Sequence, residues 1–121
     1  MVGFRQHIGR RGEDLAVDFL RRKGYRIVAR NVRQSFGEID IIARHGQFLV
    51  FVEVKTRRSD RYGSPLEAVD RRKQRQMIRA AQAYLAREVS TETAARFDVI
   101  SVLLGRERPS IQHIVNAFDL F

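Results

Sequence analysis

The sequence contains no cysteine among its 121 residues. This absence excludes disulfides, thiolate chemistry and every zinc site that uses cysteine, and it fits a reducing compartment such as the cytosol. No stretch approaches the roughly 20 consecutive apolar residues of a membrane-spanning helix. The opening residues, MVGFRQHIGRRGEDLA, lack the apolar core of a secretion signal. We therefore expect a soluble cytoplasmic protein without a membrane partner.

Several catalytic signatures are also missing. The sequence has no glycine-rich Walker loop for a nucleoside triphosphate, and no serine lies in a nucleophile-elbow pattern. His7, His45 and His113 are isolated and fall in no metal-ligand spacing, so we expect them on the surface or in turns. The chain shows no internal repeat, low-complexity tract or linker. With 44% hydrophobic residues, residues 1–121 are expected to form a single folded domain.

Charged residues are unevenly distributed along the chain. Lys and Arg total 23 against 14 Asp and Glu, which gives a net charge of +9. Residues 1–33 and 57–87 each carry +6, whereas residues 34–56 carry −1 and residues 88–121 carry −2. Clustered arginine is typical of proteins that bind a phosphate backbone, and a solvated basic surface is the plainer interpretation. An acidic segment thus lies between two strongly basic ones.

The pattern of apolar residues predicts two helices and five strands. One helix, over residues 9–23, has apolar side chains at helical spacing and ends at Gly24. A second helix begins after Pro65 and continues to about Glu88. The predicted strands cover residues 25–32, 38–44, 48–56, 95–104 and 110–118. The order α-β-β-β-α-β-β indicates an α/β fold, and the helix before the fourth strand predicts a crossover within a mixed sheet.

The segment GEIDIIARHGQFLVFVEVK is predicted to form a hairpin with a tight turn at His45 and Gly46. Side chains alternate between the two faces of a strand, so Asp40, Glu53 and Lys55 should share one face. That face is apolar near the turn and charged at its other end, and we expect the opposite face to be apolar throughout, from Ile39 through Ile41 to Val54. The predicted cross-strand pairs are Ile42 with Leu49, Asp40 with Phe51 and Glu38 with Glu53.

Two acids at this position need a positive partner. Asp40 and Glu53 would be diagonal neighbours with β-carbons about 7 Å or less apart, where two carboxylates repel by roughly 2 kcal/mol at an effective dielectric near 20. Lys55 supplies one positive charge, and a divalent cation would supply the rest, since Mg²⁺ binds one or two protein carboxylates together with water and phosphate oxygens. The alternative is a charge cluster that is neutralised by nearby arginines.

The hairpin also carries a family resemblance. Asp40 followed by Glu53-Val54-Lys55 resembles the D…(D/E)xK signature of the PD-(D/E)xK nuclease superfamily, although Ile39 stands where the nominal pattern has proline. The segments GRRGEDLA, GEIDIIA, FVEVKTR and RYGSPLEAV resemble the small bacterial YraN-type family, which is itself similar to archaeal Holliday-junction resolvases. The resemblance covers nearly the whole chain. It implies a restriction-endonuclease-like fold of three layers, with a mixed central sheet of about five strands flanked by helices.

The resemblance implies roles for individual residues. Asp40 and Glu53 would ligate Mg²⁺ or Mn²⁺ together with the backbone carbonyl of Val54. Lys55 would orient or help to deprotonate the attacking water, and Glu13 would lie near the metal. The implied activity is that of a metal-dependent endonuclease that hydrolyses DNA phosphodiesters, with branched or junction DNA as a candidate substrate in repair or recombination. Similarity to resolvases also favours a homodimer, because symmetrical cutting of two strands requires two sites.

Further candidates surround this site. Glu38 either works in the site or holds the neighbouring turn, and Gln74 either reaches the site or borders solvent. A mobile basic loop is expected over residues 57–65, in which Tyr62 either stacks on a base or packs locally. The basic residues that we expect to contact nucleic-acid phosphates are Arg10, Arg11, Arg57, Arg58, Arg61, Arg71, Arg72, Lys73, Arg75 and Arg79.

Three functions are consistent with the sequence. The leading hypothesis is the metal-dependent nuclease. The first alternative is a nucleic-acid-binding module on the same fold that does not cut, or that needs a partner to cut. The second is a basic RNA-associated structural protein, which accounts for the arginines and leaves the acidic hairpin unexplained. Contacts to the backbone carry no sequence code, so duplex, single-stranded, flap and junction DNA, and RNA, all stay open as substrates.

Overall fold

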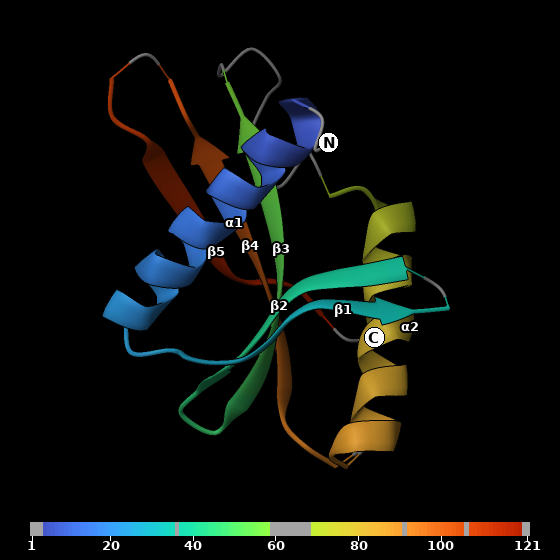
Figure 1. Ribbon diagram of the computed structural model, residues 1–121. Helices are drawn as coiled ribbons and strands as arrows, with labels where there is room; N and C mark the ends of the chain where they lie inside the picture. Colours follow the sequence, from blue (N-terminus) through green and yellow to red (C-terminus); the bar gives the residue numbers. More distant parts are fainter. Residues whose placement is uncertain (1–3, 36, 59–68, 91, 106, 120–121) are drawn as a thin grey trace.

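Five strands form one sheet with a helix on each face in the computed structural model (Figure 1). The structure describes residues 4–119, apart from residues 36, 59–68, 91 and 106. The elements in chain order are α1 (Phe4–Arg22), β1 (Arg26–Gln34), β2 (Gly37–His45), β3 (Phe48–Arg57), α2 (Arg71–Glu88), β4 (Ala95–Leu103) and β5 (Ser110–Phe118). The predicted α/β class, element order and mixed sheet are confirmed.

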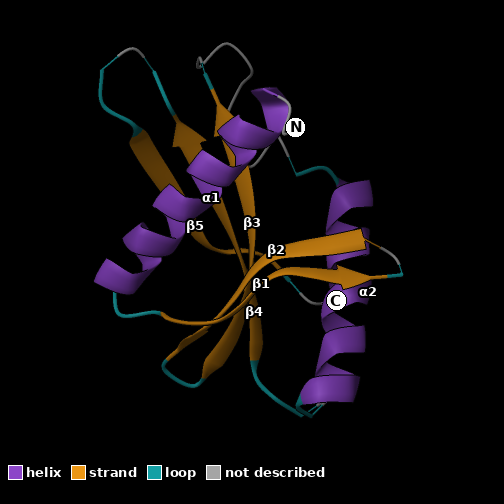
Figure 2. Cartoon of the chain, in the orientation of Figure 1, coloured by secondary structure: helices purple, strands orange, loops and turns teal. Residues whose placement is uncertain are grey.

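The strands lie in the sheet in the order in which they occur in the chain, from β1 to β5 (Figure 2). Neighbouring strands are antiparallel except β3 and β4, which are parallel and are connected through α2. A parallel pair requires such a crossover, because its connection must return to the end at which the first strand began. In the part of the chain that the structure describes, no helix is long and apolar enough to cross a membrane.

Each face of the sheet has its own hydrophobic core. On one face, Ala16, Val17 and Leu20 of α1 pack against side chains of β2, β3 and β4. On the other face, Met77 and Leu85 of α2 pack against a second set from the same strands. The two cores make a three-layer arrangement of helix, sheet and helix, and this confirms the layers that the periodicity and the resemblance predict.

Helix α1 begins at Phe4, five residues before the predicted start. Gly9 lies inside the helix, so the glycine that marks the predicted start does not interrupt it. The predicted stop is confirmed. Gly24 has a φ of 90°, and the N–H groups of Gly24 and Tyr25 donate to the carbonyls of Arg21 and Leu20 at 3.0 and 2.9 Å. This paired arrangement closes many helices with a left-handed glycine.

The register of the β2–β3 hairpin differs from the prediction by two residues. The pairs are His45 with Phe48 and Ile42 with Phe51, so the turn consists of Gly46 and Gln47. Gly46 has a φ of 58°, and a two-residue turn with a positive φ at its first central position favours glycine there. A shift of two residues leaves the paired side chains, from Ile41 to His45 and from Phe48 to Val52, on their predicted faces.

Strand β2 leaves β3 at the end that carries the acids. Pairing of β2 with β3 ends at Ile41 and Val52, whereas pairing of β1 with β2 continues to Gln34 and Gly37. Figure 1 shows this end of the β1–β2 hairpin turned toward α2. Ile39 consequently joins the core beneath α2 instead of the predicted opposite face. The predicted pairing of Glu38 with Glu53 is also wrong, because β2 has separated from β3 there.

A buried polar cluster corrects the expectation for one histidine. The His113 side chain is 2% exposed, and its Nε2 lies 2.7 Å from Oδ2 of the fully buried Asp98. His45 lies at the end of β2 beside the turn, and its ring stacks on Tyr25 with centroids 4.0 Å apart. His7 is exposed, as predicted. The sequence pattern misplaces His113 because it contains no sign that Asp98 of β4 needs a buried donor.

Candidate active site

Asp40 lies in the fork between β2 and β3. Its Oδ2 accepts a hydrogen bond of 2.8 Å from the backbone N–H of Val54. Pairing of the two strands has ended one residue earlier, at Ile41 and Val52. A side-chain carboxyl therefore takes the place of a strand carbonyl as the acceptor, which satisfies the Val54 N–H and fixes the position of Asp40.

The carboxyl groups of Asp40 and Glu53 lie close enough to interact. Burial raises the pKa of Asp40 most, and the charge of Glu53 raises it further, to about 7. The hydrogen bond from the Val54 N–H lowers this pKa but does not offset the rise. Two acids that face each other away from water repel when both are ionised. The structure thus brings together the pair of acids that the sequence predicts.

Two lysines surround Glu53, of which only 4% is exposed. The Nζ of Lys55 lies 4.0 Å from Oε1, and the Nζ of Lys73 lies 3.3 Å from Oε2. Lys73, which we expected to contact nucleic acid, instead faces the site from the first turn of α2. The capping residue Asp70 accepts a 2.8 Å hydrogen bond from the Lys73 N–H, which sets the start of this helix.

The donor set fits a small divalent cation. The N–H and C=O of one residue point to the same side of a strand, so the Val54 carbonyl faces the side on which its N–H contacts Asp40. In the described ranges, no three or more His, Cys, Asp or Glu side chains gather as a metal site. The residues present offer two carboxylates and one carbonyl, and Mg²⁺ and Mn²⁺ accept such oxygen ligands beside water and phosphate.

Glu13 of α1 faces the same site and is held by β1. Its Oε1 accepts hydrogen bonds from Arg30 at 3.1 Å and from Asn31 at 2.9 Å. Burial raises the pKa of Glu13 and the nearby charge of Asp40 adds to this, while Arg30 opposes it. Asn31 has a φ of 52°, a left-handed conformation that asparagine tolerates better than most residues. Glu13 thus lies near Asp40, with part of its hydrogen-bonding capacity used by β1.

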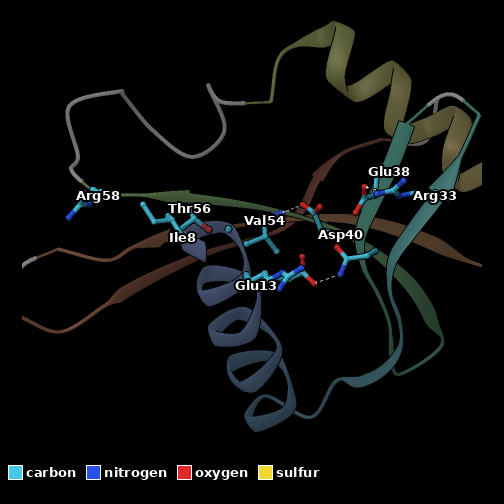
Figure 3. Close-up of a pocket in the computed structure, with 11 residues that line it drawn as sticks. Ile8, Glu13, Arg33, Glu38, Asp40, Val54, Thr56 and Arg58 are labelled. Carbon is cyan, nitrogen blue, oxygen red and sulfur yellow. Dashed lines mark hydrogen bonds and ion pairs between the residues drawn. The ribbon is translucent and has the colours of Figure 1, made fainter. Parts of the chain in front are cut away.

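A pocket of about 820 Å³ is lined by Glu13 and Asp40, whereas Glu53 and Lys55 are not among its lining residues. Figure 3 shows Glu13 and Asp40 near its middle, with Arg58 and Arg33 toward opposite ends. Arg33 lies 3.8 Å from Glu38, which is the cross-strand partner of Arg33 and part of the pocket wall. The lining residues are Ile8, Gly9, Arg10, Glu13, Asn31, Arg33, Glu38, Asp40, Val54, Thr56 and Arg58. The arrangement places acids between cations, as a site for a phosphate chain with a metal requires.

The other predicted residues are spread over the surface. Arg10 and Arg58 line the main pocket, and Arg11 lines a smaller pocket of about 310 Å³ that shares Ile8 and Arg58 with it. Arg57 ends β3, and the Gln74 side chain donates to the Val69 carbonyl at 3.0 Å instead of reaching the acids. The predicted nucleic-acid-binding residues Arg71, Arg72, Arg75 and Arg79 are exposed on α2. Arg61, Tyr62 and most of the predicted mobile loop lie outside the described residues.

Sequence reasoning missed three contributors to the site. Arg30 and Asn31 hold Glu13, and Lys73 holds Glu53. A signal was available for Asn31, because asparagine is uncommon within strands and often marks an irregular backbone. For Lys73 there was none, since it is one of several basic residues at the start of α2 and its direction depends on how the helix packs.

Comparison with known proteins places the chain in a family. The chain matches the family described as "Uncharacterised protein family UPF0102" over residues 12–102. UPF0102 proteins of Geobacter metallireducens and Symbiobacterium thermophilum are 51% and 53% identical to it over 113 and 114 residues. These alignments cover 93% of this chain in each case, and 93% and 97% of the respective relatives. The chain therefore belongs to the UPF0102 family, as the YraN-type resemblance of its motifs predicts.

Proposed function

We propose that this protein is a divalent-metal-dependent endonuclease that hydrolyses phosphodiester bonds of DNA at Asp40, Glu53 and Lys55. The observation that carries the proposal is the interaction between two carboxyl groups on neighbouring strands, at the fork where β2 leaves β3. Such a pair is unfavourable unless cations hold it, and pairs of this kind gather at functional sites. The rim of arginines around the pocket suits a polyanionic substrate.

Each residue has a defined task in this proposal. The metal, when bound, would lower the pKa of a coordinated water and offset charge on a phosphate oxygen. Asp40 and Glu53 would hold it together with the Val54 carbonyl. Lys55 would orient the attacking water and stabilise the charge that develops on the phosphate. Arginines at the two ends of the pocket would hold the flanking phosphates. These contacts are to the nucleic-acid backbone, so they do not decide between DNA and RNA. The resemblance to resolvases favours branched or junction DNA as the substrate.

Cleavage assays test the proposal directly. Wild-type protein should cut labelled branched, duplex or single-stranded DNA when Mg²⁺ or Mn²⁺ is present. Asp40→Ala, Glu53→Ala and Lys55→Ala should each slow cleavage by about 100-fold or more, because each removes part of the charge stabilisation. Glu92→Ala, which removes an exposed carboxylate beyond the end of α2, should cut like wild type. Cleavage without metal, or site variants as active as wild type, would contradict the proposed site.

A second candidate is a nucleic-acid-binding module on the same fold that does not cut, or that cuts only with a partner protein. The observation that favours it is the pairing of Glu53 with Lys55 and Lys73, which balances the carboxylate charge within the protein. A module of this kind would bind the DNA substrates and cleave none of them with either metal. Cleavage that depends on Asp40 would decide against it.

The proposed function also favours a homodimer, since symmetrical cutting of two strands requires two sites. Edge strand β5 has no Lys, Arg, Asp or Glu, whereas the other edge, β1, carries three arginines. Charge on an edge strand discourages pairing with another chain, so β5 is the more suitable contact. Light scattering should give twice the chain mass. Val115→Lys on β5 should yield monomers. The control is Val28→Lys on β1, which is similarly exposed and should leave the dimer intact. A monomeric wild type would contradict the proposed dimer.

A further inference from the structure

Helix α2 supplies a cation to a buried acid of the sheet. The Nζ of Lys73 lies 3.3 Å from Oε2 of Glu53, whose side chain is 6% exposed. Lys55 is on the same strand as Glu53 and lies farther away, at 4.0 Å from Oε1. A buried carboxylate has lost most of its hydration and depends on such partners. Lys73 is therefore the nearer of the two ammonium groups that hold Glu53.

The inward direction of Lys73 follows from the packing of α2. Asp70 caps the helix through the Lys73 N–H at 2.8 Å, and Met77, four residues later on the same side of the helix, is buried. Arg72, Arg75 and Arg79 lie on another side, where they line a shallow pocket at the surface. The helix thus separates one lysine that faces the sheet from arginines that face outward.

We propose that Lys73 is an exchangeable counter-ion, which pairs with Glu53 in the metal-free protein and leaves it when a divalent cation binds. The inference rests on the proposed function, because it assumes that Asp40 and Glu53 are the metal ligands. A cation held by both acids needs oxygen atoms of Glu53, and an ammonium group 3.3 Å from one of them repels it. The Lys73 side chain is 32% exposed, so its ammonium group has solvent into which it can move.

This exchange also gives the two lysines different tasks. Asp40, Glu53, Lys55 and Lys73 together carry two negative and two positive charges when all are ionised, so the metal-free site is balanced. A divalent cation adds two positive charges, so both ammonium groups become surplus, and the one that leaves Glu53 is available to the phosphate of an incoming nucleic acid. Lys73 is a positioning residue in this scheme, and its removal should affect metal affinity before any substrate is present.

Calorimetric titration of the full chain with Mn²⁺, without DNA, tests the inference. Lys73→Gln should bind Mn²⁺ about tenfold more tightly than wild type, because the competing charge is gone. Lys73→Met, which has a comparable length and no hydrogen-bond donor, should show the same gain. The matched control is Arg75→Gln, which removes a positive charge from the exposed side of the same helix and should leave the Mn²⁺ affinity unchanged. Without metal, both Lys73 variants should unfold at lower temperature than wild type.

Each outcome separates this inference from the proposed function. Equal or weaker Mn²⁺ binding by both Lys73 variants overturns the inference and leaves the nuclease proposal standing. An equal gain in Arg75→Gln also overturns it, because the effect is then one of net charge. No Mn²⁺ binding by any form overturns the metal site itself, and the inference with it. Tighter binding by the Lys73 variants, with no cleavage by wild type, supports the counter-ion role and contradicts the nuclease.

Discussion

At the scale of single residues, a buried carboxylate with several hydrogen-bond donors lies outside the candidate site. Asp98 of β4 is fully buried. Its oxygens contact Tyr25 Oη at 3.1 Å, Arg96 Nε at 3.0 Å, His113 Nε2 at 2.7 Å and the Asn116 N–H at 3.0 Å. Because these partners come from β4, β5 and the segment after α1, one carboxylate connects three parts of the fold. Its role is structural, in contrast to the unfavourable pair at Asp40 and Glu53.

The Asp98 cluster predicts a specific response to acid. Burial raises the pKa of Asp98, but hydrogen bonds from His113, Arg96 and Asn116 lower it to about 2 overall. A folded pKa below the unfolded value of about 4 adds stability at neutral pH, and this stability is lost as pH falls from about 4 to 2. In urea unfolding, Asp98→Asn should cost about 3 kcal/mol at pH 7, since Arg96 loses its buried partner. The variant should also lose less stability between pH 4 and pH 2.

The control for this prediction is Asp18→Asn, which changes an exposed acid of α1. It should match wild type within about 0.5 kcal/mol at pH 7 and should keep the wild-type acid response. If Asp98→Asn loses stability in acid as steeply as wild type does, the hydrogen bonds to Asp98 are not the source of that part of the acid sensitivity.

At the scale of elements, the contact of α1 with β3 positions Glu13 over the site. Gly12 is buried, and a Cβ on it would clash with Thr56 Oγ1 and would meet Thr56 Cγ2 at 2.7 Å and Cβ at 2.8 Å. The helix approaches the strand this closely because glycine has no side chain. Glu13 is the next residue, so the depth of the helix sets how far this acid reaches toward Asp40.

Substitution of the two glycines of α1 should have opposite effects. Gly12→Ala forces helix and strand apart and should cost about 2 kcal/mol. Gly9→Ala should add about 0.5–1 kcal/mol, because a Cβ there meets nothing within 4 Å and alanine favours helix. Chemical unfolding measures both. Thr56→Ala, which removes the two nearest atoms, should recover part of the loss when it is combined with Gly12→Ala; no recovery would refute the proposed contact.

At the scale of the whole molecule, the net charge of +9 is arranged around an acidic centre. Arg10, Arg33 and Arg58 line the pocket that contains Asp40, while further arginines lie on α2. Each arginine that contacts a phosphate releases counter-ions, and this makes binding depend on salt. The distribution of charge therefore predicts a measurable salt dependence for nucleic-acid binding.

Binding to duplex DNA should weaken with salt according to the number of pocket arginines that contact phosphates. With three contacts, the logarithm of the association constant should fall with a slope of about −3 against the logarithm of salt concentration. Arg10→Gln and Arg33→Gln should each reduce this slope by about 1. Arg22→Gln, at the exposed far end of α1, is the matched control. Fluorescence anisotropy measures the slopes, and equal slopes in all three variants would contradict the assigned substrate path.

Much of the fold and part of the site could be predicted from sequence because the relevant signals are local. Apolar spacing located both helices and all five strands, and Gly24 correctly marked the end of α1. Strand alternation predicted that Asp40 and Glu53 lie close together, and the faces of the paired residues survived an error of two residues in register because faces repeat every two residues. The start of α1 was wrong, since Gly9 is accommodated within the helix.

The sequence by itself thus determined the order of elements, the two buried faces and the pairing of Asp40 with Glu53. The tertiary structure alone decided where β2 leaves β3, which lysine lies nearer to Glu53 and which donors hold Asp98. These contacts join residues far apart in the chain, such as Lys73 with Glu53 and His113 with Asp98. Such contacts depend on how helices and strands pack in three dimensions, and no local periodicity records that packing.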